Sequence, residues 1–280
     1  MKYFDLHCDT ASACAEKGIG FNDNSLAVSA NKGKIFTEWY QCFAVFINDT
    51  SIDPKTEYRK QISGIKYKIK DYGINPIFTL ENALPIDSID FINELVRDSI
   101  SAVTLTWNGE NMLAGGVDTD AGLKNFGRCV IHKLNEHNIA VDLSHLNRKS
   151  FYEVLGEAEI IFASHSCCDK THHHKRNLTD EQLKLIADRE GIIGVCFYPE
   201  FLGTKYAFEG VWRHIYHMLN IGLENNIAIG SDFDGATMSA ELDGVDKIPE
   251  LYRFLISKGI GNDILNKVFF ENAKKFFKKL

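Results

Sequence analysis

The amino-acid sequence predicts an α/β fold, specifically a (β/α)8 or TIM barrel. Three observations predict it: eight short apolar runs are rich in β-branched residues, helix-like segments separate most of them, and no repeat or proline-rich linker interrupts the series. Strands that alternate with helices favour parallel pairing through right-handed crossovers, and eight such units close into a barrel. We expect a single domain over residues 1–280, because one barrel commonly spans ~250 residues.

The strands and helices can be placed along the chain from the periodicity of apolar residues and from the residues that typically begin or end such elements. The predicted strands cover residues 3–9, 36–47, 74–81, 101–107, 139–145, 160–166, 192–198 and 227–232. The predicted helices cover residues 54–72, 87–99, 120–138, 147–158, 179–190 and 211–226. The helix over 179–190 has the clearest boundaries, because Thr179 and Gln182 match a capping box and Gly191 follows its end.

The first predicted strand argues against the main alternative fold, a doubly wound open sheet. A sheet of that type that binds a dinucleotide carries a glycine-rich phosphate-binding turn after its first strand. Here the strand is followed by no such turn, and His7-Cys8-Asp9-Thr10 occupies the position instead. The barrel is therefore the preferred prediction.

Charge and hydropathy exclude two classes of partner. The net charge of −7 argues against non-specific nucleic-acid binding, which needs a clustered basic surface. The C-terminal residues carry too many charges for a membrane span or a lipid-anchor signal. We interpret them as an amphipathic helix that packs Phe269, Phe270, Ala273 and Phe276 inward. We therefore expect neither nucleic acid nor membrane as a partner.

The cysteine pattern indicates a reducing, cytoplasmic compartment. Seven cysteines occur, an odd number without the regular spacing of a disulfide framework. Cys167 and Cys168 are neighbours, and we interpret them as inert rim thiols in preference to a redox pair. A secretory signal is not expected either, because its cleavage would remove His7, a candidate metal ligand.

Metal-compatible side chains close five of the predicted strands. The active sites of TIM barrels lie at the C-terminal ends of the strands, so these residues should meet at one rim. Imidazole and carboxylate groups together suit a borderline divalent metal such as zinc. Six donors exceed the need of one zinc ion and suit two ions that share a bridging carboxylate and a bridging water. The donors are His7, Asp9, Glu81, His145, His165 and Asp232.

At this point the motifs resemble those of the renal, or membrane, dipeptidase family, peptidase family M19, whose amidohydrolase-like barrels bind metal. The resemblance covers nearly the whole chain and keeps the order of the motifs, which together are highly specific. They are Asp5-Leu6-His7-Cys8-Asp9, Glu81, Leu105-Thr106, Asp142-Leu143-Ser144-His145, Ser164-His165-Ser166, Lys175-Arg176-Asn177 and Gly230-Ser231-Asp232-Phe233-Asp234-Gly235.

The resemblance implies a binuclear metal centre and a metal-dependent dipeptidase, a hydrolase acting in proteolysis. It implies His7, Asp9 and Glu81 on one Zn²⁺, with Glu81 bridging, and His145 and His165 on the second. Two zinc ions would lower the pKa of a bridging water towards neutrality and supply hydroxide for attack on an amide.

The remaining site residues are assigned by the same resemblance. It implies that Arg176 binds the carboxylate of a dipeptide, to which a guanidinium offers two hydrogen bonds, and that Asp232 is the catalytic acid/base. Tyr198 resembles an aromatic residue that lines the family's substrate pocket, although a packed rim tyrosine is nearly as good an interpretation. The resemblance extends to dipeptides with a C-terminal D-residue.

One departure from the family pattern concerns the fourth strand. Trp107 stands where the mammalian-type pattern has a histidine that holds the substrate carbonyl. An indole donates one hydrogen bond but carries no positive charge, so stabilisation of an oxyanion would shift to the metals or to a donor such as Asn108. The chain is also short for the family.

Asp142 and the histidine run at 172–174 can each be interpreted in two ways. Asp142 precedes His145 by three residues and should face away from the site, either as a partner of the ligands or in solvent. The run His172-His173-His174 is interpreted as a solvated loop in preference to an adventitious metal site.

Two alternative functions stay open. One keeps the two metals but acts on another small carboxylate-bearing amide, such as an N-acyl amino acid or a lactam. The other is a non-catalytic barrel that binds metal or peptide, motivated by Trp107. Manganese, iron or cobalt would also suit the ligands, and a homodimer is left open.

Overall fold

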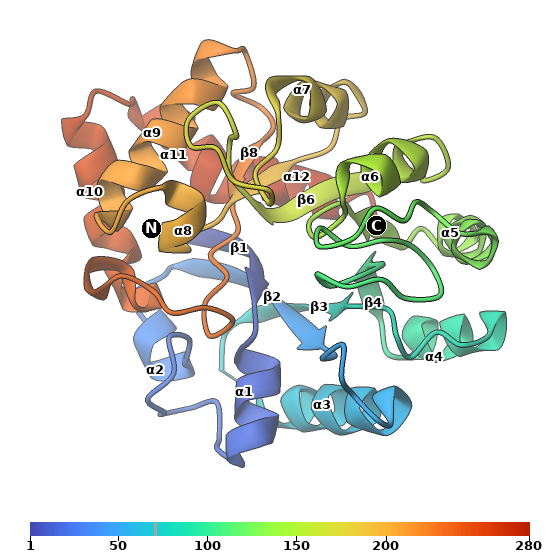
Figure 1. The fold of residues 1–280 in the computed structure, drawn as a ribbon. Helices are drawn as coiled ribbons and strands as arrows, with labels where there is room; N and C mark the ends of the chain where they lie inside the picture. The colour runs from blue at the N-terminus through green and yellow to red at the C-terminus, as the bar shows by residue number, and fades with distance from the viewer. Residues whose placement is uncertain (70–71) are drawn as a thin grey trace.

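Eight parallel strands form a closed barrel in a computed structural model that describes residues 1–69 and 72–280. Figure 1 shows the helices arranged around the barrel. Neighbouring strands pair in chain order, and β1 closes the barrel against β8 through Asp5 and Ile229. The predicted (β/α)8 fold is confirmed. The strands are β1 (Lys2–Cys8), β2 (Glu38–Phe46), β3 (Asn75–Glu81), β4 (Ile100–Thr104), β5 (Ala140–Asp142), β6 (Ile161–Ser166), β7 (Ile193–Val195) and β8 (Ile227–Ile229).

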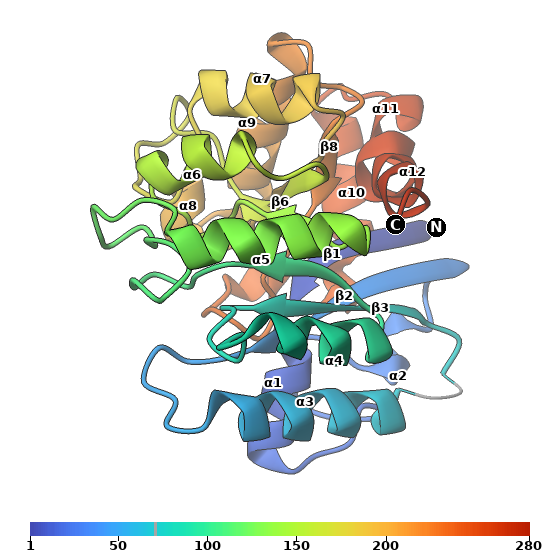
Figure 2. The same cartoon turned by 90° about the vertical axis from the view of Figure 1, so that its right-hand side faces the viewer.

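The helices form an outer layer, which is seen from the side in Figure 2. They bury an apolar face on the barrel and end mostly in short loops. The α-helices are α1 (Thr10–Lys17), α2 (Ala30–Gly33), α3 (Pro54–Lys68), α4 (Ile92–Arg97), α5 (Asn125–Glu136), α6 (Arg148–Leu155), α7 (Asp180–Asp188), α8 (Pro199–Leu202), α9 (Ala207–Asn220), α10 (Ile248–Ser257), α11 (Asn262–Asn266) and α12 (Asn272–Phe277). The capping box predicted at Thr179 is confirmed, with Gln182 as its partner.

All six predicted helices differ from the observed ones at one or both ends; the prediction over 120–138, for example, is α5, Asn125–Glu136. The predicted helix over 54–72 is α3, which ends at Lys68, and residues 70–71 of that prediction lie outside the described residues. The predicted helix over 211–226 is α9, which begins earlier, at Ala207. Gly210 is tolerated inside α9 because α8 packs closely there, where an added Cβ would come 2.8 Å from Leu202.

Several strands are shorter than predicted, and this matters for the site. The predicted strands over 139–145 and 227–232 end in the structure at Asp142 and Ile229. The chain then turns through left-handed residues, with φ of 59° at His145 and 63° at Asp232. These two candidate residues therefore lie on the loops that follow the strands, where a turn can aim them inward.

Aromatic side chains close the end of the barrel opposite to these loops. Phe270, Ala273 and Phe276 are buried at the C-terminal end of the chain, and Phe276 packs 5.5 Å from the ring of Phe162 on β6. Phe269 is buried in the main core. The predicted inward face of the C-terminal segment is thus confirmed. In the described residues no helix is long and apolar enough to cross a membrane.

Candidate metal centre

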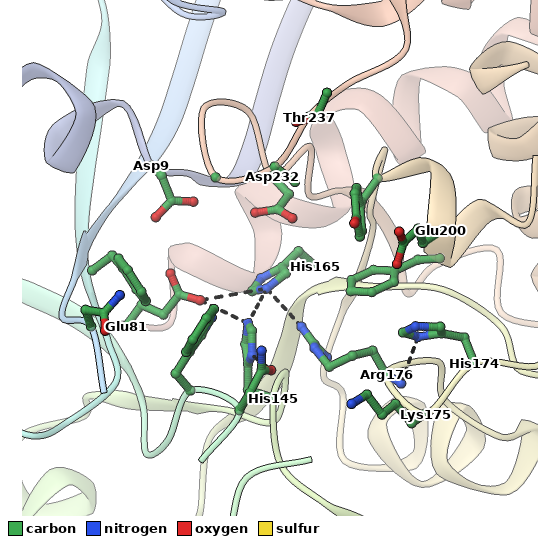
Figure 3. Close-up of a pocket in the computed structure, with 18 residues that line it drawn as sticks. Asp9, Glu81, His145, His165, His174, Lys175, Arg176, Glu200, Asp232 and Thr237 are labelled. Carbon is green, nitrogen blue, oxygen red and sulfur yellow. Dashed lines mark hydrogen bonds and ion pairs between the residues drawn. The ribbon is translucent and has the colours of Figure 1, made fainter. Parts of the chain in front are cut away.

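The predicted metal ligands meet at the C-terminal ends of the strands. Figure 3 shows four of them, Asp9, Glu81, His145 and His165, in the cavity that they line. His7 lies on β1 and His165 on β6, whereas Glu81 is the last residue of β3. Asp9 follows β1 as the N-cap residue of α1. All four side chains are buried, and so is His145 on the loop after β5.

Glu81 lies between two groups of donors. Its Oε2 atom is 3.4 Å from His7 Nε2, and that imidazole is 3.3 Å from Asp9 Oδ2. Its Oε1 atom is 3.0 Å from His145 Nε2 and 3.9 Å from His165 Nε2. Each oxygen of this carboxylate thus faces a different pair of side chains. In the described part of the chain both triads, His7/Asp9/Glu81 and Glu81/His145/His165, have ligand atoms within 4.8 Å of one another.

The hydrogen bonds behind the two histidines of the second triad fit metal ligation. Ser164 Oγ donates to Asp142 and lies 2.7 Å from His165 Nδ1, so that nitrogen must carry the proton. His145 Nδ1 lies 2.9 Å from Asn108 Oδ1, an acceptor. Both Nε2 atoms then present lone pairs, and they are 2.8 Å apart. Two facing lone pairs repel each other, so this arrangement suits a cation between them.

The first triad has unsatisfied buried atoms that also fit a metal. Neither His7 Nε2 nor Asp9 Oδ1 has a hydrogen-bond partner among the described residues. Burial and the charge of Glu81 raise the pKa of Asp9 to about 8. Burial also acts to raise the pKa of Glu81, but His7 and His145 outweigh it and hold that pKa well below its usual range. Buried carboxylates packed this closely need positive charge beside them.

Asp142 anchors the second triad from below. Its Oδ1 accepts hydrogen bonds from the backbone amides of Ser144 (3.0 Å) and Ser164 (2.9 Å). Its Oδ2 accepts from Thr104 Oγ1 (3.0 Å) and from the Ser164 hydroxyl that contacts His165. Asp142 is therefore a buried partner of the ligands, which was the first of the two predicted interpretations.

Asp5 has the matching position below the first triad. Its Oδ1 and Oδ2 accept hydrogen bonds from the amide (2.8 Å) and the hydroxyl (2.6 Å) of Ser231. The same hydroxyl oxygen lies 3.0 Å from the carbonyl oxygen of His7. Asp5, Ser164 and Ser231 were not identified from the sequence as residues that support the ligands. The available signal was that an aspartate precedes a ligand histidine by two or three residues in both motifs.

A cavity of about 440 Å³ opens above the triads. Phe46 and Trp107 line one wall, with their rings 5.4 Å apart and edge to face. Tyr198 and Phe201 line another, 5.0 Å apart. Trp107 is half-buried, its ring lies 6.3 Å from that of His145, and it leaves the cavity open.

Arg176 enters the cavity beside His165. Only 6% of its surface is exposed, and this burial lowers the pKa of its guanidinium. Its Nη2 lies 3.0 Å from His165 Nε2, its Nε has no partner among the described residues, and its guanidinium carbon is 5.2 Å from the Phe201 ring centroid. A buried cation with spare donors in a cavity can bind an anionic group.

The histidine run next to Arg176 divides between solvent and cavity. His173 is exposed and lies 3.0 Å from Asp169, whereas His174 lines the cavity and accepts a hydrogen bond from the amide of Arg176. In the described residues none of the potential metal groups includes this run.

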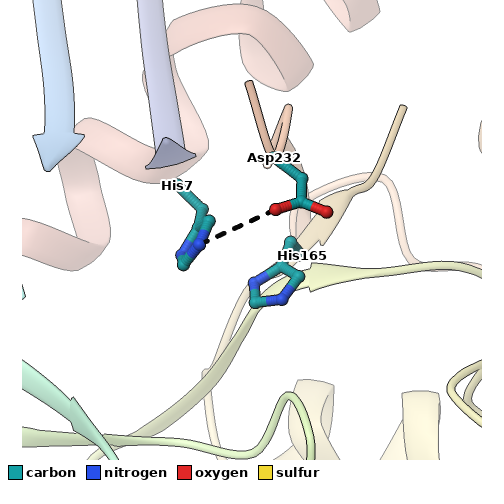
Figure 4. Close-up of side chains that lie close together, drawn as sticks. All are labelled: His7, His165 and Asp232. Carbon is teal, nitrogen blue, oxygen red and sulfur yellow. Dashed lines mark ion pairs between the residues drawn. The ribbon is translucent and has the colours of Figure 1, made fainter. Parts of the chain in front are cut away.

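Asp232 lies beside His7 and His165, as Figure 4 shows. Its Oδ1 is 3.9 Å from His7 Nε2. Burial, with a smaller contribution from the charge of Glu81, raises the pKa of Asp232 to about 6, although His7 opposes the shift. Gly235 lets the loop approach, because an added Cβ there would come 2.2 Å from Asp9 Oδ2. A carboxyl with this pKa can accept and release a proton near neutral pH.

Comparison with known proteins places the chain among peptidases. A sequence profile of the membrane dipeptidase family, peptidase family M19, matches residues 50–280. A Schizosaccharomyces pombe protein named as an uncharacterized dipeptidase is 30% identical over 80% of this chain, which spans only 58% of that protein.

Two solved structures share the fold. A metallopeptidase dipeptidase of family M19 superposes with a TM-score of 0.91 at 22% identity and covers 99% of this chain and 98% of its own. A Rhodobacter sphaeroides metallopeptidase, bound to a phosphinate mimic of the dipeptide L-Ala-D-Ala, gives 0.85 at 21% identity and covers 99% of each chain.

Proposed function

The chain belongs to the membrane dipeptidase family, peptidase family M19, and from this premise we propose that it is a dizinc hydrolase that cleaves the amide bond of dipeptides. The observation that carries the proposal is the position of Glu81, whose two carboxylate oxygens each face a separate group of buried donors. A shared carboxylate between two donor groups is the arrangement expected of a binuclear centre.

In this proposal His7 and Asp9 would hold one zinc ion, His145 and His165 would hold the other, and Glu81 would be a ligand of both. When bound, zinc would supply a water of lowered pKa and polarise the substrate carbonyl. Asp232 takes a proton from the attacking water and passes it to the departing amine. Its carboxyl reaches the first triad and has a pKa of about 6, which supports both transfers near neutral pH.

Arg176 is proposed to bind the substrate's C-terminal carboxylate. Its burial in the cavity close to His165 would limit substrates to very short peptides, because the scissile amide must reach the metals at the same time. Trp107 and Tyr198 would form apolar walls, and Asn108 would contribute its carboxamide to substrate binding. We include dipeptides with a C-terminal D-residue, because the Rhodobacter metallopeptidase was solved with a mimic of L-Ala-D-Ala.

A panel of dipeptides tests the proposal with purified, zinc-loaded protein. We expect turnover of free dipeptides, none of dipeptide amides, and two zinc ions per chain by elemental analysis. Asp232→Asn should lower kcat by about 10²- to 10⁴-fold, the usual range for general acid–base catalysis. Asp243→Asn, a change at an exposed residue between β8 and α10 that does not line the cavity, is the matched control. An inactive wild type, or full activity in Asp232→Asn, would contradict the proposal.

Trp107 supports a second candidate function. Because it lines the cavity without a positive charge, the enzyme would act on another small amide with one carboxylate, such as an N-acyl amino acid or a lactam. Higher kcat/KM for N-acetyl amino acids than for dipeptides at equal zinc content would favour this candidate. A non-catalytic barrel predicts fewer than two ions per chain and no turnover of either class.

The cellular location is proposed to be the cytoplasm. All seven cysteines are unpaired, and six of them are buried. Free thiols throughout a chain are typical of a reducing compartment. Fractionation of the native cells, with an antibody to the protein, tests this location.

A further inference from the structure

Cys196 lies at the end of β7, directly beside the loop that carries Asp232. Backbone hydrogen bonds fix the two segments together: the amide of Gly230 donates to Val195 (3.2 Å), and the amide of Phe197 donates to Ser231 (3.2 Å). Cys196 is fully buried. Its side chain is therefore held at one place against the neighbouring loop.

The thiol of Cys196 points at the Asp232 carboxylate. Its Sγ lies 3.7 Å from Asp232 Oδ2, within the longer range of a sulfur hydrogen bond. The same sulfur accepts a hydrogen bond from the amide of Tyr198 at 3.4 Å. Because the sulfur is an acceptor on that side, its own proton is free to point at Asp232. Burial raises the pKa of the thiol well above its ordinary value, which keeps this proton in place.

The two carboxylate oxygens of Asp232 face different partners. In the described residues the Cys196 thiol is the one side-chain or backbone donor to the Asp232 carboxylate. It engages Oδ2, whereas Oδ1 faces His7 and the first triad. A carboxylate with one oxygen held cannot rotate freely about its terminal bond, so Oδ1 stays directed at the reacting groups.

We propose that Cys196 is a positioning residue for Asp232: its S–H donates to Oδ2 and keeps Oδ1 aimed at the metal centre. The proposal rests on the proposed function, in which Asp232 moves protons. No bond is made or broken at sulfur, and the thiol keeps its proton throughout. The expected effect is on kcat and not on KM, because Cys196 does not line the cavity that would hold the substrate.

The kinetic test compares Cys196→Ala and Cys196→Ser in the zinc-loaded enzyme. We expect Cys196→Ala to lower kcat by about three- to tenfold, the usual effect of one hydrogen bond, with KM unchanged. Cys196→Ser restores a donor and should recover most of the loss. Cys168→Ala is the matched control, because Cys168 is equally buried but donates to the carbonyl oxygen of His214 at 3.6 Å.

A vibrational measurement tests the contact without turnover. The S–H stretching band of Cys196, identified by its loss in Cys196→Ala or its shift to O–H in Cys196→Ser, should move to higher frequency in Asp232→Asn. A carboxamide is a weaker acceptor than a carboxylate, so the S–H bond weakens less. Cys168→Ala should leave this band in place.

The outcomes separate the two proposals. A wild type that hydrolyses no dipeptide overturns the proposed function and, with it, the basis of this inference. An active wild type with Cys196→Ala equally active, with Cys196→Ser no better than Cys196→Ala, or with no band shift in Asp232→Asn overturns the role of Cys196 alone.

Discussion

Replacing Ser164 by alanine tests whether the polar chain behind His165 sets metal affinity. The Ser164 hydroxyl donates to Asp142 Oδ2 and lies 2.7 Å from His165 Nδ1. It therefore fixes the tautomer of this imidazole, with the Nε2 lone pair directed at the second triad. Alanine keeps the backbone amide that also binds Asp142, so the change removes the hydroxyl alone.

The size of the effect follows from what is left unpaired. Losing a partner of a ligating histidine costs about 10- to 100-fold in metal affinity, or about 1.4 to 2.7 kcal/mol. Asp142 keeps its hydrogen bonds from Thr104 and from the amides of Ser144 and Ser164. His165 is left with a buried unsatisfied N–H, and the Ser144 hydroxyl loses its contact with Ser164 Oγ at 3.2 Å, so we expect the whole of that range, about 10- to 100-fold.

Competitive titration with a zinc chelator resolves the two binding steps. Ser164→Ala should weaken one step by this factor and leave the other step unchanged, because His7 and Asp9 do not contact Ser164. Ser150→Ala is the control, since Ser150 is also fully buried but hydrogen-bonds the loop at Gly115 and Ala121. The reasoning is refuted if both steps weaken equally or if neither changes.

Three further predictions follow from other residues. Arg176→Met should raise KM for free dipeptides by about 10- to 100-fold, as loss of a charge-assisted hydrogen-bond pair implies, and an unchanged KM in steady-state assays would contradict its proposed role. Glu81→Gln should reduce zinc below two ions per chain in elemental analysis, whereas two ions retained at wild-type affinity would exclude a bridging role. Burial lowers the pKa of His214 to about 4, so as the pH falls this histidine is protonated in the unfolded chain before it is protonated in the folded one. The free energy of unfolding should therefore drop by about 2 kcal/mol between pH 7.5 and 5. Urea unfolding at both pH values should show that this part of the drop is absent in His214→Gln.

Much of the fold could be predicted from the sequence because barrel strands are continuous apolar runs. The eight runs gave the number and order of the strands correctly, and the closed barrel is confirmed. Helix α1 was not predicted, because Thr10–Lys17 has a weak apolar face and follows β1 after a single residue, Asp9. Helix α10 (Ile248–Ser257) was missed for lack of a helix start signal other than Pro249.

The candidate metal ligands could be predicted from the sequence, but not the residues that hydrogen-bond behind them. His7, Glu81 and His165 lie at strand ends, where periodicity points directly at the rim. His145 and Asp232 were predicted as the last residues of their strands, whereas they lie on the following loops with positive φ, which periodicity does not report. The layer below the ligands depends on contacts between residues far apart in the chain, such as Asp5 with Ser231, and no local pattern encodes such a contact.

The residues with left-handed backbone conformation around the site lower the stability of the fold at positions that the proposed activity requires. Asn82, His145, Asp232 and Asp234 all have φ between 59° and 68°, a conformation that costs a non-glycine residue on the order of 1 kcal/mol. Asparagine and glycine tolerate it best, so selection for stability alone would favour them at His145 and Asp232. A thermostable variant obtained without an activity screen is therefore expected to lose the reaction first, and an engineering programme should hold these positions fixed.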